Sequence, residues 1–178
     1  MRCTARSTRG CPTLPEIDGL RIRPAVRALV VDPDDRVLLV RFEFPTVTVW
    51  ATPGGGVEGD EDDEFALRRE LDEELGLTDV EIGPHIWSRR HIIPFLDGSW
   101  DGQDDRIYLV RVPAFVPRPR FGWEQLRAER VHELRWWTPG ELMTANDERT
   151  RFAPRRLSEL VHALLADGPP AAPIDTGV

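Results

Sequence analysis

Runs of apolar residues separated by short polar segments predict several β-strands. Residues 23–31 and 36–42 are rich in Val and Leu, and the segment between them, Asp32-Pro33-Asp34-Asp35, has the composition of a turn. These two runs therefore predict a β-hairpin. A shorter β-branched run over residues 47–52 precedes a proline and three glycines. Further strands are predicted over residues 80–93, 106–112 and 131–137.

Three other segments have the composition, the end signals or the periodicity of helices. Residues 62–75 are rich in Glu, Arg, Leu and Ala, and Gly76 follows where a left-handed residue often ends a helix. Thr138-Pro139-Gly140-Glu141 matches a capping box, which marks a helix start. Residues 155–166 predict an amphipathic helix, because apolar residues recur on one face. These residues are Leu157, Leu160, Val161, Leu164 and Leu165.

The order of these elements predicts a fold of the α/β class. Strands mixed with a few helices indicate one domain built on a mixed sheet, spanning residues 20–167. Residues 1–19 are expected to be a disordered leader, and residues 168–178, which begin Gly168-Pro169-Pro170, a flexible tail. The length of 178 residues, with 40% hydrophobic and 30% charged residues, suits a single globular domain.

Composition and charge argue against several classes of protein. A net charge of -8 argues against general binding to nucleic acid or to an anionic membrane surface. No apolar run approaches the roughly 20 residues that a membrane-spanning helix needs. Cys3 and Cys11 are too few and too close to the start for a disulfide framework or a metal finger. Because the first residues also lack the apolar stretch of a secretory signal, we expect a cytoplasmic location.

The acidic residues are concentrated in the first predicted helix and just before it. Residues 58–74 contain ten acids and two arginines, and charges balance over the rest of the chain. Glu70, Glu73 and Glu74 fall within an arc of about 100°, because positions i, i+3 and i+4 are neighbours on a helix. Such charges about 6 Å apart repel by roughly 3 kcal/mol per pair. Oxygen ligands without clustered Cys or His favour Mg²⁺ or Mn²⁺ as the counter-charge, and such ions in turn favour a di- or triphosphate.

Three consecutive glycines, Gly54-Gly55-Gly56, precede the acidic helix. Glycines allow the backbone to turn close to a ligand, and a bare carbonyl there is suited to complete a metal shell. The glycines and the carboxylates together are consistent with metal-assisted phosphate chemistry.

The glycines and the helix follow one spacing. It reads Gly55, five residues, Glu61, seven residues, Arg69-Glu70-Leu71, one residue, Glu73-Glu74, one residue, Gly76-Leu77. Every fixed position of this pattern resembles the sequence box of the Nudix hydrolase family, and flanking features extend the resemblance over about residues 22–145. One departure is Gly59-Asp60, where many members have Pro-Gly; it affects the loop rather than the ligands.

The resemblance implies a Nudix-type α/β/α sandwich on a mixed sheet, and hydrolysis of a nucleoside diphosphate linked to another moiety. It implies that Glu70, Glu73, Glu74 and the carbonyl of Gly54 hold Mg²⁺ or Mn²⁺. It also implies that Arg69 orients these carboxylates, and that Glu61 supports them or a second ion. In the family a further acid from a later loop often serves as ligand or base. Here the candidates are Asp104, Asp105 and Glu129, and the sequence does not choose among them.

Arg89, Arg90 and Arg106 flank a polar segment over residues 97–105 that is long enough to be a binding loop. They are candidates to bind substrate phosphates in a bidentate manner, and surface ion pairing is the equally plausible alternative. A second functional hypothesis is a non-catalytic member of the fold that binds or senses a nucleotide-like ligand. The identity of the nucleotide derivative stays open, as does a homodimer.

Overall fold

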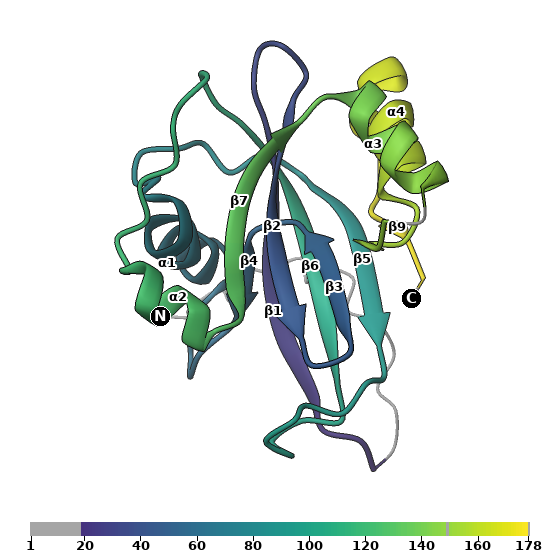
Figure 1. The fold of residues 1–178 in the computed structure, drawn as a ribbon. Helices are drawn as coiled ribbons and strands as arrows, with labels where there is room; N and C mark the ends of the chain where they lie inside the picture. The colour runs from purple at the N-terminus through teal and green to yellow at the C-terminus, as the bar shows by residue number, and fades with distance from the viewer. Residues whose placement is uncertain (1–18, 149, 178) are drawn as a thin grey trace, which may run out of the picture.

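A mixed β-sheet with helices on both faces forms the structure, a computed structural model that describes residues 19–148 and 150–177 (Figure 1). The elements in chain order are β1 (Ile22–Val31), β2 (Val37–Phe44), β3 (Val47–Ala51), β4 (Gly54–Gly56), α1 (Asp63–Leu75), β5 (His85–His91), β6 (Gly102–Arg111), α2 (Trp123–Ala128), β7 (Val131–Trp137), α3 (Pro139–Asp147), β8 (Phe152–Ala153), α4 (Leu157–Asp167) and β9 (Ile174–Asp175).

Strand β1 changes neighbours along its length. The strand order is β8-β3-β2-β1-β6-β5-β9, with β4 paired to β1 and β7 paired to β2. Val30 and Val31 at the end of β1 pair with β2, which confirms the predicted hairpin. Residues 25–27 of β1 pair instead with the glycine strand β4, and β6 runs parallel to β1 along its whole length. The glycines therefore lie beside the central strand of the sheet.

Alternating residues of β1 pack into two separate cores. Leu29 and Val31 belong to the core that also contains residues of α3 and α4. Val26, Ala28 and Val30 belong to the core on the other face, which contains the leucines of α1. Figure 1 shows α1 and α2 on one side of the sheet and α3 and α4 on the other. The expected α/β/α arrangement on a mixed sheet is confirmed.

The structure confirms the predicted end of α1 and the predicted start of α3. Helix α1 begins after Asp62, whose side chain accepts a hydrogen bond from the backbone N–H of Phe65. It ends at Gly76, which has a φ of 68° and donates its N–H to the carbonyl of Asp72. Helix α3 begins with the capping box of Thr138 and Glu141.

The polar segment predicted as a binding loop is partly a strand. Gly102 to Asp105 belong to β6 and pair with β1, and the strand predicted over residues 80–93 begins only at His85. Gln103 and Asp105 are buried despite being polar, because arginines on neighbouring strands satisfy Asp105. Local sequence does not predict this part of β6, because Arg27 and Arg89, which permit the burial of Asp105, are distant in the chain.

The two ends of the chain were expected to lack structure. Part of the segment expected to be a flexible tail is ordered, because Ile174–Asp175 forms β9 parallel to β5. The N–H of Thr176 also donates to the carbonyl of Ser88 over 2.9 Å. The expected leader, with Cys3 and Cys11, lies outside the described residues except for Gly19. Over the described part of the chain, no helix combines the length and apolar character needed to cross a membrane.

Candidate active site

Helix α1 presents its acids beside the face that anchors it. Leu67, Leu71 and Leu75 are fully buried against the sheet. The neighbouring side chains of Glu70 and Glu73 keep only 12% and 14% exposure. Packing of the leucine stripe therefore fixes two carboxylates at a partly desolvated position.

Glu74 is the most deeply buried of the three helix carboxylates. Its Oε2 accepts a hydrogen bond from the backbone N–H of Gly54 over 2.8 Å. Burial, followed by the negative charge of Glu70, raises the pKa of Glu74 to about 8. Burial also raises the pKa of Glu70, although Arg69 opposes the change. Burial therefore disfavours the ionised form of both carboxylates, and Arg69 opposes this only in part at Glu70.

Glycine is required where β4 meets β1 and α1. Gly54 has a φ of 126°, and a Cβ there would lie 2.3 Å from the carbonyl oxygen of Val26. A Cβ on Gly55 would lie 2.5 Å from Oε1 of Glu70. A Cβ on Gly54 would therefore clash with the backbone of β1, whereas a Cβ on Gly55 would force the carboxylate of Glu70 to move.

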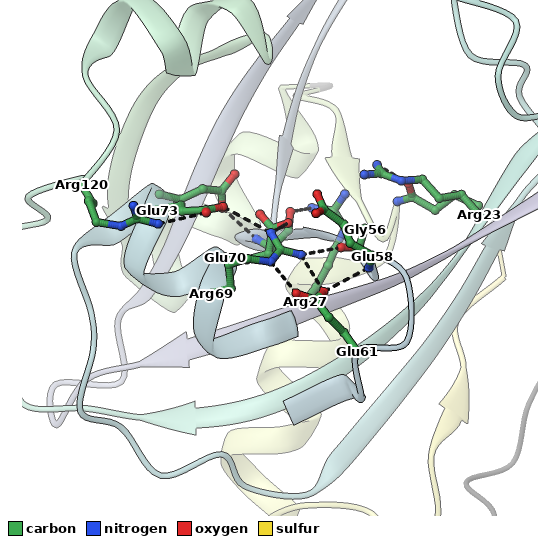
Figure 2. A network of polar contacts seen from close by, with 12 residues as sticks. Arg23, Arg27, Gly56, Glu58, Glu61, Arg69, Glu70, Glu73 and Arg120 are labelled. Carbon is green, nitrogen blue, oxygen red and sulfur yellow. Dashed lines mark hydrogen bonds and ion pairs between the residues drawn. The ribbon is translucent and has the colours of Figure 1, made fainter. Parts of the chain in front are cut away.

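Arg69 connects the acids to the glycine strand (Figure 2). Its Nε and Nη2 bind the carboxylate of Glu61 over 2.9 and 3.0 Å. Its Nη1 lies 2.8 Å from Oε1 of Glu70 and 3.2 Å from Oε2 of Glu73, and Nη2 donates to the carbonyl of Gly56 over 2.9 Å. The hydrogen bonds to Glu61 contribute most to raising the pKa of Arg69. Arg69 therefore holds three carboxylates of the sequence box together.

Two further arginines, which the sequence analysis did not single out, border this network. Arg120, in the segment before α2, binds Oε1 of Glu73 over 2.9 Å and also pairs with Asp72. Arg23 on β1 stands close to Gly56, since a Cβ on that glycine would meet its guanidinium. Burial, followed by the charge of Arg27, lowers the pKa of Arg23. The one hydrogen bond of its guanidinium to another described residue is a 3.4 Å contact with Gln103.

The donor atoms fit a hard divalent cation. They are carboxylate oxygens and a glycine carbonyl, which suit Mg²⁺ or Mn²⁺. Burial disfavours the ionised forms of Glu70 and Glu74 and raises their pKa values, and a bound cation would favour the ionised forms. Among residues 19–148 and 150–177, however, no three acidic, His or Cys side chains converge in a ready-made metal cage. Glu70 and Glu73 receive their counter-charge from Arg69 in this structure.

The three later acids have different surroundings. Asp104 pairs with Arg90. Asp105 is buried between Arg27 and Arg89; burial acts to raise its pKa, but the two cations outweigh burial and hold the pKa below its usual value. Glu129, which follows α2, has its pKa raised by partial burial and by the charge of Glu73. Its charge in turn acts on Glu74. Glu129 is therefore the later acid that lies within electrostatic range of the α1 carboxylates.

The three arginines predicted to hold phosphates are each bound to a carboxylate. Arg89 binds Asp105 over 2.8 Å, and Arg90 binds Asp104. Arg106 binds Asp63 at the start of α1, where Tyr108 also donates to Asp63. The structure thus brings Glu61, Arg69, Glu70, Glu73, Glu74 and Gly54 together, and it engages these three arginines in ion pairs elsewhere.

Comparison with known proteins identifies the family. The sequence model described as the NUDIX domain matches residues 21–160. The chain therefore belongs to the Nudix family. The resemblance found in the sequence box is thereby extended over most of the chain.

Known relatives and solved structures agree with this assignment. Nudix hydrolase 25 of Arabidopsis thaliana is 33% identical over 101 residues, covering 51% of this chain and 57% of that protein. An RNA pyrophosphohydrolase of Halorhodospira halophila is 31% identical over 136 residues, covering 70% of this chain and 73% of that protein. The crystal structure of the MutT protein of Methanosarcina mazei Go1 has a TM-score of 0.58 at 16% identity, covering 84% of this chain and 96% of that one. That last likeness concerns the fold alone. The match spans less than two thirds of the Arabidopsis relative.

Proposed function

We propose that this chain is a divalent-metal-dependent pyrophosphohydrolase acting on a nucleoside diphosphate linked to another moiety. The observation that carries this proposal is the contact between Gly54 and Glu74, which joins the glycine strand to the carboxylates of α1. Buried carboxylates beside a backbone carbonyl are a donor set that suits a hard divalent cation.

In this proposal, Glu70, Glu73, Glu74 and the carbonyl of Gly54 would hold Mg²⁺ or Mn²⁺, with Glu61 in support. The bound ion would supply charge neutralisation at phosphate oxygens and a lowered pKa for an attacking water. Arg69 would keep the carboxylates in place through its contacts with Glu61 and Glu70.

Glu129 is the residue we propose to accept a proton from the attacking water. Its carboxyl group lies within electrostatic range of Glu73, and a carboxylate is a suitable general base for a metal-bound water. Arg23 is proposed to bind a substrate phosphate, because its guanidinium lies beside Gly56 and makes no ion pair with a described carboxylate. Arg89, Arg90 and Arg106 stay candidates for phosphate binding only if the substrate displaces their acids.

The proposed substrate is a nucleotide that carries a 5′-polyphosphate, and the 5′-triphosphate end of RNA is the first member to test. Several relatives of this chain bear the name RNA pyrophosphohydrolase.

A non-catalytic ligand-binding role is the second candidate, and one observation favours it. Arg69 and Arg120 already neutralise Glu70 and Glu73, as they would in a protein that needs no metal. An enzyme must give up part of these ion pairs when a cation binds.

A panel assay separates the two candidates. Triphosphorylated oligoribonucleotide, nucleoside triphosphates, dinucleoside polyphosphates, nucleotide sugars and ADP-ribose are incubated with Mg²⁺ or Mn²⁺, and products are identified by mass. Calorimetry with the same compounds detects ligands that bind without cleavage. The proposal expects metal-dependent cleavage of at least one compound. Tight binding without any cleavage would favour the ligand-binding role instead.

A further inference from the structure

Arg27 on β1 pairs with Gly54 on β4, and its side chain also contacts the glycine strand. Its Nη1 donates to the carbonyl of Thr52 over 2.9 Å and to the carbonyl of Gly54 over 3.0 Å. Its Nε donates to Oδ1 of Asp105 over 2.9 Å. One guanidinium therefore joins the glycine strand to β6 on the other side of β1.

Asp105 gives this guanidinium a fixed anchor. The carboxylate is buried, and its Oδ1 also accepts a hydrogen bond from Nε2 of Gln103 over 2.7 Å. Its Oδ2 accepts a hydrogen bond from Nη1 of Arg89 over 2.8 Å. Because three side chains hold Asp105, Arg27 cannot move without breaking a buried network.

Gly54 is held at both of its polar groups. Its N–H donates to Glu74 and its carbonyl accepts from Arg27. The preceding carbonyl, that of Pro53, accepts from the N–H of Ala28 over 2.9 Å. Glycine loses more conformational freedom on ordering than any other residue, so a strand of three glycines depends on such contacts.

We propose that Arg27 is a positioning residue, which orders the glycine strand and aims the carbonyl of Gly54 before a metal ion binds. The part of this proposal that concerns the order of the glycine strand depends only on the contacts of Arg27. The link to metal binding rests on the proposed function.

Loss of Arg27 has two effects of opposite sign on cation binding. Removing a positive charge close to a metal ligand would strengthen binding of the cation. Releasing the carbonyl would weaken it, because the ion would then have to order the strand. Arg27 is already paired with Asp105, which offsets much of its charge. We therefore expect the loss of order to outweigh the change in charge.

The test compares Arg27→Met and Arg27→Lys with wild type and with Arg36→Met. Arg36 pairs with the buried Asp32 at the hairpin turn, so Arg36→Met removes a comparable ion pair without touching β4. Lysine keeps the charge of Arg27 but lacks the planar fork that reaches Thr52, Gly54 and Asp105 together.

Two measurements are made on each protein. Hydrogen exchange of the Gly54 amide in metal-free protein is expected to be at least tenfold faster in both Arg27 variants and unchanged in Arg36→Met. The dissociation constant for Mn²⁺, from calorimetry, is expected to be at least tenfold higher in both Arg27 variants. If Arg27→Met does not fold, Arg27→Lys carries both measurements.

Wild-type exchange at Gly54 in the Arg27 variants, or unchanged or tighter Mn²⁺ binding, would overturn the inference. Full recovery of both properties in Arg27→Lys would also overturn it, since charge alone would then explain the role of Arg27. Neither measurement uses turnover. A wild-type chain that binds no Mn²⁺ or cleaves nothing would defeat the proposed function, while exchange at Gly54 would still test the positioning role.

Discussion

The backbone N–H of Gly54 donates to the carboxylate of Glu74 over 2.8 Å, although the two residues are 20 positions apart in the sequence. This contact ties the glycine strand to helix α1. The carbonyl of Gly54 and the carboxylates of the helix therefore form one unit, which explains why the glycines and the glutamates occur at fixed spacing. We therefore expect a substitution in the glycine strand to disturb the carboxylates of α1, and a substitution in α1 to disturb the glycine strand.

Gly55→Ala is expected to displace Glu70 and lower kcat/KM at least about 100-fold. The new Cβ would lie 2.5 Å from Oε1 of Glu70, so the carboxylate must move. Gly140→Ala in the first turn of α3 is the matched control, because no atom lies within 4 Å of its new Cβ. Steady-state kinetics and melting temperatures of both variants check this. Activity within twofold of wild type in Gly55→Ala would mean that Glu70 is not needed where it stands.

Glu74→Gln is expected to abolish the stabilising effect of Mg²⁺ while leaving the metal-free protein at least as stable as wild type. A neutral amide still accepts from Gly54 but avoids the burial of a negative charge. Wild type is expected to melt at a higher temperature in millimolar Mg²⁺ than in chelator. Thermal unfolding with and without Mg²⁺ measures both effects. An equal metal-dependent increase in the variant would exclude Glu74 as a ligand.

Glu129→Gln is expected to lower kcat by about 10- to 1,000-fold with little change in the melting temperature. The residue stands at the surface within range of Glu73, so its loss should affect the reaction rather than the fold. Glu124→Gln on α2 serves as the control, because that glutamate is exposed. The pH dependence of kcat is recorded for both. An unchanged pH dependence of kcat in Glu129→Gln would exclude Glu129 as the proton acceptor and leave Asp104 and Asp105 as the candidates.

His91 is expected to make stability fall on the acidic side of neutrality. Its Nδ1 is buried with no hydrogen-bond partner among the described residues. Burial, followed by the charge of Arg89, lowers the pKa of His91 to about 4, whereas the unfolded chain takes up the proton near 6.5. The stability contributed is therefore complete above pH 6.5 and is lost as the pH falls towards 4.

Urea unfolding of wild type and His91→Gln between pH 7 and pH 4.5 measures this effect. The advantage of wild type over the variant should shrink by about 1–3 kcal/mol over that interval. Parallel curves for the two proteins would show that folding does not lower the pKa of His91.

Local sequence predicted those elements whose signals lie within one element. The left-handed Gly76 and the capping box of Thr138 are local signals, and the structure confirms both. Strand β9 and the start of β6 were not predicted, because each depends on a strand far along the chain. A polar residue such as Asp105 indicates a loop until its cationic partners are known.

In the candidate site, too, local sequence patterns predicted some features and long-range contacts determined others. The spacing of Glu70, Glu73 and Glu74 on one helix predicted that they would share a face, and the contacts of Arg69 with Glu70 and Glu73 agree with this for those two residues. Arg27 was missed because only the register of β1 against β4 brings it to Gly54. No local pattern distinguishes that arginine from one on a solvated strand.

Metal-dependent cleavage by the carboxylates of α1 is tested most directly by phosphorus NMR of a triphosphorylated oligoribonucleotide and the other panel compounds. Wild type, Glu73→Gln, Glu74→Gln and Glu64→Gln are compared in Mg²⁺ and in chelator, with Glu64 as a control because it is an exposed acid of the same helix. We expect wild type and Glu64→Gln to cleave at least one compound in Mg²⁺ only, and the other two variants to be slower by at least about 100-fold. Equal rates in all four proteins, or undiminished cleavage in chelator, would contradict the proposed role of these glutamates.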